Sequence, residues 1–349
     1  MEPRATLLSV SADELAERVT ALGGRKFHGR AARREVLERG VLDYAAMTSL
    51  PASLREALAA ELPILSGQER LRTVASDRTT KLLIDFPGRE AVDPVETVHI
   101  PPHDPADTRG ATLCVSTQVG CPVGCPFCAS GIAGLSRNLR AHEILEQYVL
   151  GRAVGPLGRS VVMGIGEPLL NLTALTEALD AVHDEMGLGA RRITVSTVGF
   201  PDRLHRAARS QPRFQLAISL HTPDDEQRDE LVPAMRGVPV EEVLAAGDDW
   251  FEVTGREVTY EVALLGGEND TPGHAERLAR RLRGRRCTVN LIPWNPSPEL
   301  PYLRPSPGGP EAFRDALASR GVVATVRWSR GLDGDAACGQ LRHRHAAGS

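Results

Sequence analysis

Hydrophobic and polar positions follow a regular alternation of strand-like and helix-like segments over most of the chain. From residue 112, apolar runs predict strands at 112–117, 160–165, 193–198, 214–220, 257–264 and 287–293. Helical patterns separate them near 141–153, 173–186, 201–209, 240–253 and 273–283, and a last helix and strand follow near 310–319 and 322–328. This order predicts parallel βαβ units. Six or seven units fall short of an eight-fold barrel, so we expect an α/β partial (β/α)6 barrel over 111–341, with its site at the carboxyl ends of the strands.

The segment before the barrel has a different pattern. Residues 10–62 predict short helices, the first over 12–22 with Ser11 as its cap and Glu14 as a capping-box partner. Two β-like runs, 79–86 and 95–100, flank Pro87-Gly88 and predict a hairpin. We therefore expect a helical domain over 1–75, a hairpin and linker over 76–110, the barrel over 111–341, and a disordered tail over 342–349.

Composition and charge narrow the class of protein. The chain has 349 residues, 42% apolar and 25% charged, as in ordinary globular proteins. No run of 18 apolar residues and no signal-peptide core is present, so we expect a cytoplasmic protein without a membrane partner. The net charge of −4 gives no global sign of nucleic-acid binding, but residues 25–39 carry a local excess of six basic over two acidic side chains.

Cysteines supply the first chemical signal, because four of the six lie between residues 114 and 128. Cys121, Cys125 and Cys128 form a CxxxCxxC motif just after the first barrel strand. Three thiolates can bind three irons of a [4Fe–4S] cubane and leave the fourth iron open. A ferredoxin would supply a fourth cysteine nearby. A structural zinc site would need four ligands in paired spacing. The motif is typical of radical-SAM enzymes, in which S-adenosylmethionine (SAM) binds the open iron.

Further segments resemble the RlmN/Cfr family of adenine-specific radical-SAM RNA methyltransferases. The similar segments are 111–139, 164–172, 193–199, 216–223, 289–296 and 335–341, and the resemblance extends over about 15–341. It implies SAM contacts by Gly166, Glu167, Ser196, Ser219, Leu220, His221 and Asn295. The sequence departs from the family pattern at Pro233-Ala234-Met235 and at 327–331, which reads Arg-Trp-Ser-Arg-Gly.

The resemblance also implies a mechanism. One SAM methylates the sulfur of Cys338, and a second supplies a 5′-deoxyadenosyl radical that removes hydrogen from this methyl group. The carbon radical adds to adenine, Glu96 accepts the proton of the substrate carbon, and Cys114 resolves the adduct through a transient disulfide with Cys338. Cys287 matches no role in the family and is interpreted as a core residue.

The expected function is methylation of adenine C2 in 23S rRNA, with tRNA as a further substrate. Implied partners are these RNAs and an external one-electron donor such as flavodoxin, and the chain is expected to be a monomer. A basic patch, consisting of Arg25, Lys26, Arg30, Arg33 and Arg34, is interpreted as an RNA-docking surface, with a solvated helix face as the alternative. Methylation at C8, action on another RNA or a small molecule, and a non-catalytic Fe–S RNA-binding or sensor protein remain alternatives. The presence of Cys338, Cys114 and Glu96 argues against the last.

Overall fold

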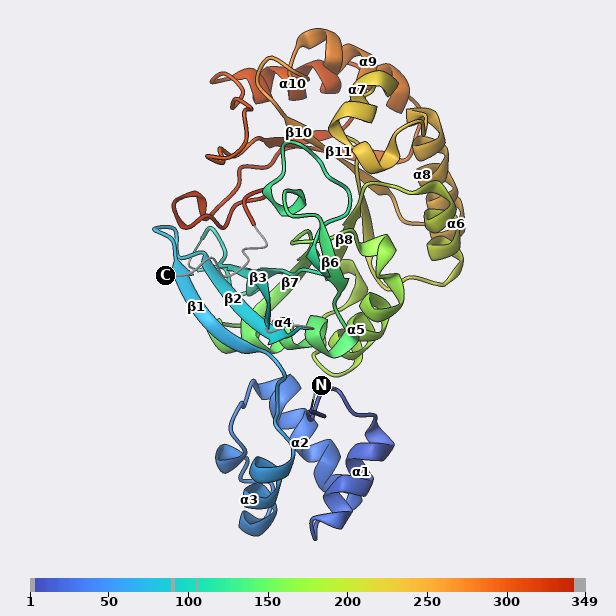
Figure 1. Ribbon diagram of the computed structural model, residues 1–349. Coiled ribbons are helices and arrows are strands. Elements are labelled where there is room, and N and C mark those ends of the chain that lie inside the picture. The colour runs from blue at the N-terminus through green and yellow to red at the C-terminus, as the bar shows by residue number, and fades with distance from the viewer. Residues whose placement is uncertain (1–3, 89–91, 105, 342–349) are drawn as a thin grey trace.

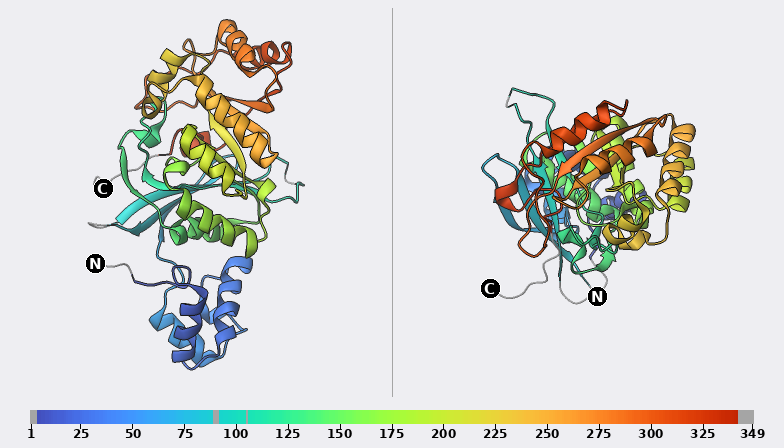
Figure 2. Two further views of the ribbon diagram at one scale, coloured as in Figure 1. Left: turned by 90° about the vertical axis from the view of Figure 1, so that its right-hand side faces the viewer. Right: turned by 90° about the horizontal axis from the view of Figure 1, so that it is seen from above.

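A computed structural model of the chain describes residues 4–88, 92–104 and 106–341. The tail that we expected to be disordered, 342–349, lies outside the described residues. The described residues form a curved sheet with helices outside it and a helical lobe at one end (Figures 1 and 2).

One ten-stranded sheet runs through the described part of the barrel and its linker, in the order β1-β2-β3-β4-β7-β8-β9-β10-β11-β12. The strands from β4 to β12 pair in parallel. They are β4 (Ala111–Cys114), β7 (Leu157–Val162), β8 (Ile193–Thr197), β9 (Gln215–Ser219), β10 (Val258–Leu264), β11 (Cys287–Pro293) and β12 (Ala324–Val326). The order is linear, with no pairing between β4 and β12 among the described residues, so the predicted open, partial barrel is confirmed.

Helices connect the parallel strands, as the sequence pattern predicted. They are α4 (Ala141–Val154), α5 (Leu172–Asp184), α6 (Pro201–Arg209), α8 (Val240–Thr254), α9 (Pro272–Leu282) and α10 (Gly309–Ala318). In Figure 1 they lie around the outside of the sheet. Helix α7 (Asp225–Leu231) was not predicted, because its residues are almost all polar and carry no apolar period. The short antiparallel pair β5 (Gln118–Gly120) and β6 (Leu135–Asn138) was not predicted either.

The predicted hairpin is present and extends the barrel sheet. β2 (Thr80–Pro87) and β3 (Val92–Ile100) pair antiparallel, and β3 pairs antiparallel with β4, with Val98 opposite Cys114. The outer strand β1 (Gln68–Val74) pairs with β2 and was not expected, because most of its residues are polar and exposed. The hairpin therefore places Glu96 of β3 on the strand next to that of Cys114.

The N-terminal lobe contains α1 (Ala12–Ala21), α2 (Lys26–Arg39) and α3 (Ala52–Glu61) (Figure 1). The Ser11 hydroxyl caps α1 by accepting from the Glu14 amide at 3.2 Å, as predicted, while the Glu14 carboxylate binds Arg18 at 2.8 Å. Leucine, valine and alanine side chains on one side of these helices form the core of the lobe, since they are buried at 15, 19, 32, 36, 54 and 58.

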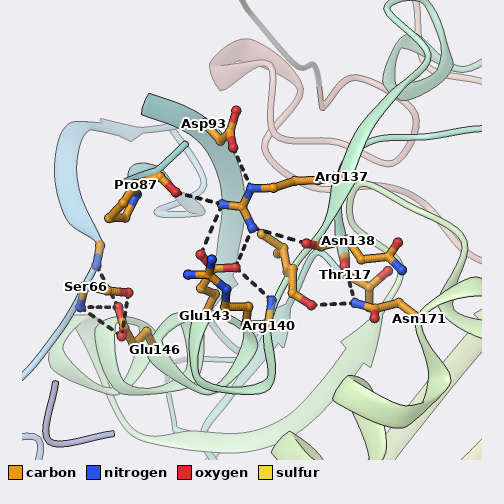
Figure 3. A network of polar contacts seen from close by, with 12 residues as sticks. Ser66, Pro87, Asp93, Thr117, Arg137, Asn138, Arg140, Glu143, Glu146 and Asn171 are labelled. Atoms are coloured by element: carbon orange, nitrogen blue, oxygen red, sulfur yellow. Dashed lines mark hydrogen bonds and ion pairs between the residues drawn. The ribbon is translucent and has the colours of Figure 1, made fainter. Parts of the chain in front are cut away.

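Buried carboxylates of α4 join the linker to the barrel (Figure 3). Glu146 accepts hydrogen bonds from the amides of Ser66 and Gly67 at 2.8–3.0 Å. Glu143 pairs with Arg137 of β6 at 2.7 Å, and Arg137 also binds Asp93 of β3. These contacts fix the linker and the hairpin against the first helix of the barrel.

Candidate active site

A cavity opens at the carboxyl ends of the parallel strands, where the motif residues of the sequence converge. Its wall contains all three motif cysteines and a cysteine from the C-terminal loop. Residues at or just after the ends of β7, β8, β9 and β11 complete it. The predicted site residues in this wall are Cys121, Cys125, Cys128, Gly166, Glu167, Ser196, Ser219, His221, Asn295 and Cys338. Leu220 is fully buried in the hydrophobic core and does not line the cavity.

The three motif cysteines are partly buried in the loop after β5 and line one cavity wall. Burial raises the pKa of Cys121 to about 12 and that of Cys125 well above its usual range, with neighbouring motif thiols adding to both. In the described part of the chain, no three His, Cys, Asp or Glu side chains converge on a point suited to a single metal ion. A cubane binds each thiolate on a different iron, so it requires more widely spaced ligands than one ion does. The three thiols fit such a cluster.

Glu167 lies in the turn after β7, and hydrogen bonds from the end of β8 hold its carboxylate in place. Its carboxylate accepts from the Thr197 hydroxyl at 2.6 Å and from the Val198 amide at 2.9 Å. Burial raises its pKa, and these hydrogen bonds oppose the shift. Gly166 has φ +116°, and a Cβ there would lie 2.7 Å from the Thr117 hydroxyl. Only glycine fits without strain, which explains the Gly-Glu pair at this turn.

Two buried oxygens in the cavity wall have no hydrogen-bond partner within the described residues: Oε1 of Glu261 and Oδ1 of Asn295. The other oxygen of Glu261 lies 3.4 Å from the Ser196 hydroxyl, which also contacts Ser219 at 3.2 Å. Unpaired buried acceptors are costly, so a ligand with N–H and O–H donors fits this wall. The amino group and ribose hydroxyls of SAM provide such donors.

Glu261 is a site residue that sequence reasoning missed. It is the single charged side chain in the run Val258–Leu264, and it is 4% exposed. Burial raises its pKa, and Arg327 opposes that shift. A lone carboxylate in an otherwise apolar or neutral strand was the signal available in the sequence, because buried charges are rare unless paired.

His221 supports the cysteine loop by direct contact with Phe127. Its Nδ1 accepts from the Ala263 amide at 3.2 Å, and burial lowers its pKa to about 3, so the ring is neutral. It meets the Phe127 ring edge-on at 4.8 Å between centroids, and the Trp294 indole donates to the Phe127 carbonyl at 2.8 Å. His221 and Trp294 thus hold the residue that precedes Cys128.

Cys338 reaches the site because the C-terminal loop is tied to the cysteine loop. The Ser130 hydroxyl donates to the Leu341 carbonyl at 2.8 Å across 211 positions of sequence, and the Ala129 amide donates to Gly339 at 2.9 Å. Asn295 donates to the Cys338 carbonyl at 3.0 Å. Cys338 is exposed and lies in the cavity wall, where surrounding protein atoms desolvate its thiol.

A second cavity adjoins the first and shares Cys338 in its wall. Cys114, at the end of β4, lies in the same wall, together with Met163, Arg327 and Trp328. Burial raises the pKa of the Cys114 thiol to about 11 and that of Cys338 to about 12. Both thiols are free. The predicted carrier and resolving cysteines therefore face one space.

Glu96 lies outside both cavity walls. Its carboxylate oxygen is 2.9 Å from the Lys81 ammonium, and both side chains are buried. Lys81 also donates to the Asp335 carbonyl at 3.0 Å, so this pair supports the loop that carries Cys338.

The basic patch is smaller than the sequence suggested. Arg25, Lys26, Arg30 and Arg34 are exposed on or beside α2. Arg33 instead forms a two-point ion pair with Glu185, just after α5, at 2.7 and 2.9 Å. Its guanidinium is held against the barrel, so we correct its assignment as a phosphate contact.

Comparisons with known proteins agree with this geometry. The family model of the radical SAM superfamily matches residues 115–282. A protein of Parasynechococcus marenigrum described as a probable dual-specificity RNA methyltransferase RlmN is 43% identical, over 97% of this chain and 98% of its own length. A Synechococcus protein with the same description is 44% identical, over 96% of this chain and 97% of its own length.

A solved structure resembles the whole chain. It is a radical SAM methyltransferase from Sphaerobacter thermophilus, with a TM-score of 0.88 and 41% sequence identity over 97% of this chain and 100% of that chain. Separately, no helix in the described part of the chain is long and apolar enough to cross a membrane.

Proposed function

Because the chain belongs to the RlmN family of radical-SAM RNA methyltransferases, we propose that it methylates C2 of an adenine in 23S rRNA and in tRNA through a methyl group carried by Cys338. The observation that carries this proposal is the position of Cys338 in the walls of both cavities. A carrier sulfur has to face the group that loads it on one side and the base that receives the carbon on the other.

The first cavity has the residues that the cofactors require. Cys121, Cys125 and Cys128 would hold a [4Fe–4S] cluster, and SAM would lie against the polar wall that includes Ser196, Ser219, Glu261 and Asn295. When bound, the cluster and SAM supply a methyl group and, from a second SAM in each turnover, a radical formed with one electron from an external donor such as flavodoxin. The buried wall excludes water from this chemistry.

The second cavity has the residues that the transfer to RNA requires. The target adenine has to leave its stack to reach a sulfur in a cavity wall, as for other enzymes that act on bases. Loss of one hydrogen atom from the methyl group on Cys338 to the 5′-deoxyadenosyl radical would leave a carbon radical that bonds to adenine C2. The adduct then loses one electron, which the cluster would accept, and the C2 proton, which Glu96 accepts after it leaves its ion pair with Lys81 outside the cavity wall. The Cys114 thiolate attacks the Cys338 sulfur, so an S–S bond forms as the S–C bond breaks, and the released carbon takes up a proton to become the methyl group. A thiol reductant restores both cysteines.

Nucleoside mass spectrometry tests this proposal most simply. Reconstituted enzyme, SAM, reductant and either a 23S rRNA fragment or tRNA should yield 2-methyladenosine, and Cys338→Ala should yield none while it retains its iron. Cys287→Ala is the matched control, since Cys287 lines neither of these cavities. Formation of 8-methyladenosine would contradict the regiochemistry. Unmethylated RNA with an active cluster would contradict the function.

A further inference from the structure

Trp328 is the exposed tryptophan of this protein. The chain has three tryptophans. Trp250 and Trp294 are 0% and 5% exposed, whereas Trp328 is 51% exposed. Trp328 belongs to the wall of the cavity that Cys338 and Cys114 share. A half-exposed indole in this wall lies where the cavity meets solvent.

The chain on both sides of Trp328 is fixed by inward contacts. The Arg327 amide donates to the Leu291 carbonyl of β11 at 2.8 Å. The Ser329 hydroxyl accepts from Asn295 at 2.8 Å, and the same Asn295 amide holds the Cys338 carbonyl. Arg330 donates to the Pro101 carbonyl at 2.8 Å and also binds Asp77. The indole is thus presented from a backbone whose position relative to Cys338 is set.

The positively charged side chain of Arg304 lies beside the Trp328 indole. The guanidinium carbon of Arg304 lies 5.5 Å from the Trp328 ring centroid, in cation–π geometry. Arg304 is exposed and forms no ion pair with the described residues, whereas the neighbouring Arg330 is already bound to Asp77. With Arg304 beside the ring, Trp328 as a whole residue is still 51% exposed.

We propose that Trp328 is a stacking platform for the base next to the target adenine, and that Arg304 binds the adjoining phosphate. This inference rests on the proposed RNA substrate. A base that leaves its stack exposes the face of its neighbour, and an aromatic ring can cover that face. A flat, fixed, half-exposed indole beside an unpaired guanidinium matches a base beside a phosphate. Trp328 would then be a positioning residue that keeps the target adenine over Cys338.

Steady-state kinetics with RNA as the varied substrate test this role. Truncation of a stacked aromatic residue weakens binding by roughly 5- to 150-fold per base. We therefore expect Trp328→Ala to raise KM for RNA within that range, with kcat at saturating RNA close to that of the wild type. Trp328→Phe should restore most of the affinity. Val323→Ala is the control, since Val323 is 64% exposed on the same segment and lines neither cavity.

Fluorescence gives a second readout that a structural role would not change. RNA should quench the emission of the wild type, and Trp328→Phe should lose that quenching while it still binds RNA. Unchanged KM in Trp328→Ala, or equal quenching in wild type and Trp328→Phe, would overturn the inference. A lower kcat with unchanged KM in both Trp328→Ala and Trp328→Phe would also overturn it. If the wild type binds and is quenched by RNA but does not methylate it, the proposed function fails while the platform stands.

Discussion

Glu146 shows at the residue scale how burial of one carboxylate gives the protein a pH dependence. Burial raises its pKa to about 7, although three hydrogen bonds from Ser66 and Gly67 oppose the shift (Figure 3). The folded state therefore holds a proton that the unfolded state releases at a lower pH. The free energy of unfolding consequently falls as pH rises from the ordinary carboxyl pKa to about 7, and is constant above that.

Replacement of Glu146 by Gln should remove this dependence. The amide oxygen can still accept from Ser66, the amide nitrogen no longer accepts from Gly67, and no charge forms. The wild type should lose about 1 kcal/mol of unfolding free energy between pH 6 and pH 8 through this group, and Glu146→Gln should lack that difference. Denaturant unfolding of the reconstituted protein at both pH values measures it. Glu177→Gln, an exposed position on α5, is the control, and an identical pH dependence in all three proteins would refute the assignment.

At the scale of elements, α2 has two different sides. Arg33 binds Glu185 of the barrel, whereas Arg25, Lys26 and Arg30 at the start of the helix are exposed. The inward contact fixes the lobe, and the outward side is the part of the basic patch that can contact RNA phosphates. Sequence position alone could not separate the two, because the partner of Arg33 is 152 residues away.

The exposed part of α2 should contribute to RNA affinity through phosphate contacts. Joint replacement of Arg25, Lys26 and Arg30 by Ala should weaken RNA binding and lower the dependence of log K on log salt by roughly 0.7–0.9 per lost contact. Binding titrations at several salt concentrations measure the slope. The control variant replaces Arg280, Arg283 and Arg286, which removes the same charge from the α9–β11 connection. If the slope of log K against log salt is the same in the α2 variant and in the control variant, the exposed side of α2 is an ordinary solvated face.

At the scale of the whole molecule, the sequence predicts the barrel well because most of its strands and helices carry their own periodic signal. The limits of β7 to β11 agree with their predicted runs to within a few residues. Contacts between distant segments carry no such signal. The connection of the Cys338 loop to the cysteine loop through Ser130 and Leu341 joins two ends of the barrel, and only the family resemblance pointed to it. Glu261 and Trp328 become interpretable only once the cavities are known.

The same arrangement explains why two cavities meet at one residue. Strands β4 to β11 bring the cysteine motif and the polar wall proposed to bind SAM together at one edge of the sheet. Ile100 at the end of β3 and the C-terminal loop complete a second cavity, which Cys114 also lines and which shares Cys338 with the first. Loading of the carrier sulfur and delivery to RNA can thus occur on opposite sides of a single side chain.

Trapping of the protein–RNA adduct in Cys114→Ala tests the central claim that Cys338 carries the methyl carbon. Without the resolving thiol, the bond between the Cys338 sulfur and the methylene group that joins it to adenine cannot break. The account predicts a denaturation-resistant protein–RNA band that nuclease removes, that maps to the peptide containing Cys338, and that is absent from Cys114→Ala/Cys338→Ala and from Cys287→Ala. Normal turnover by Cys114→Ala without an adduct, or an adduct on another residue, would contradict it.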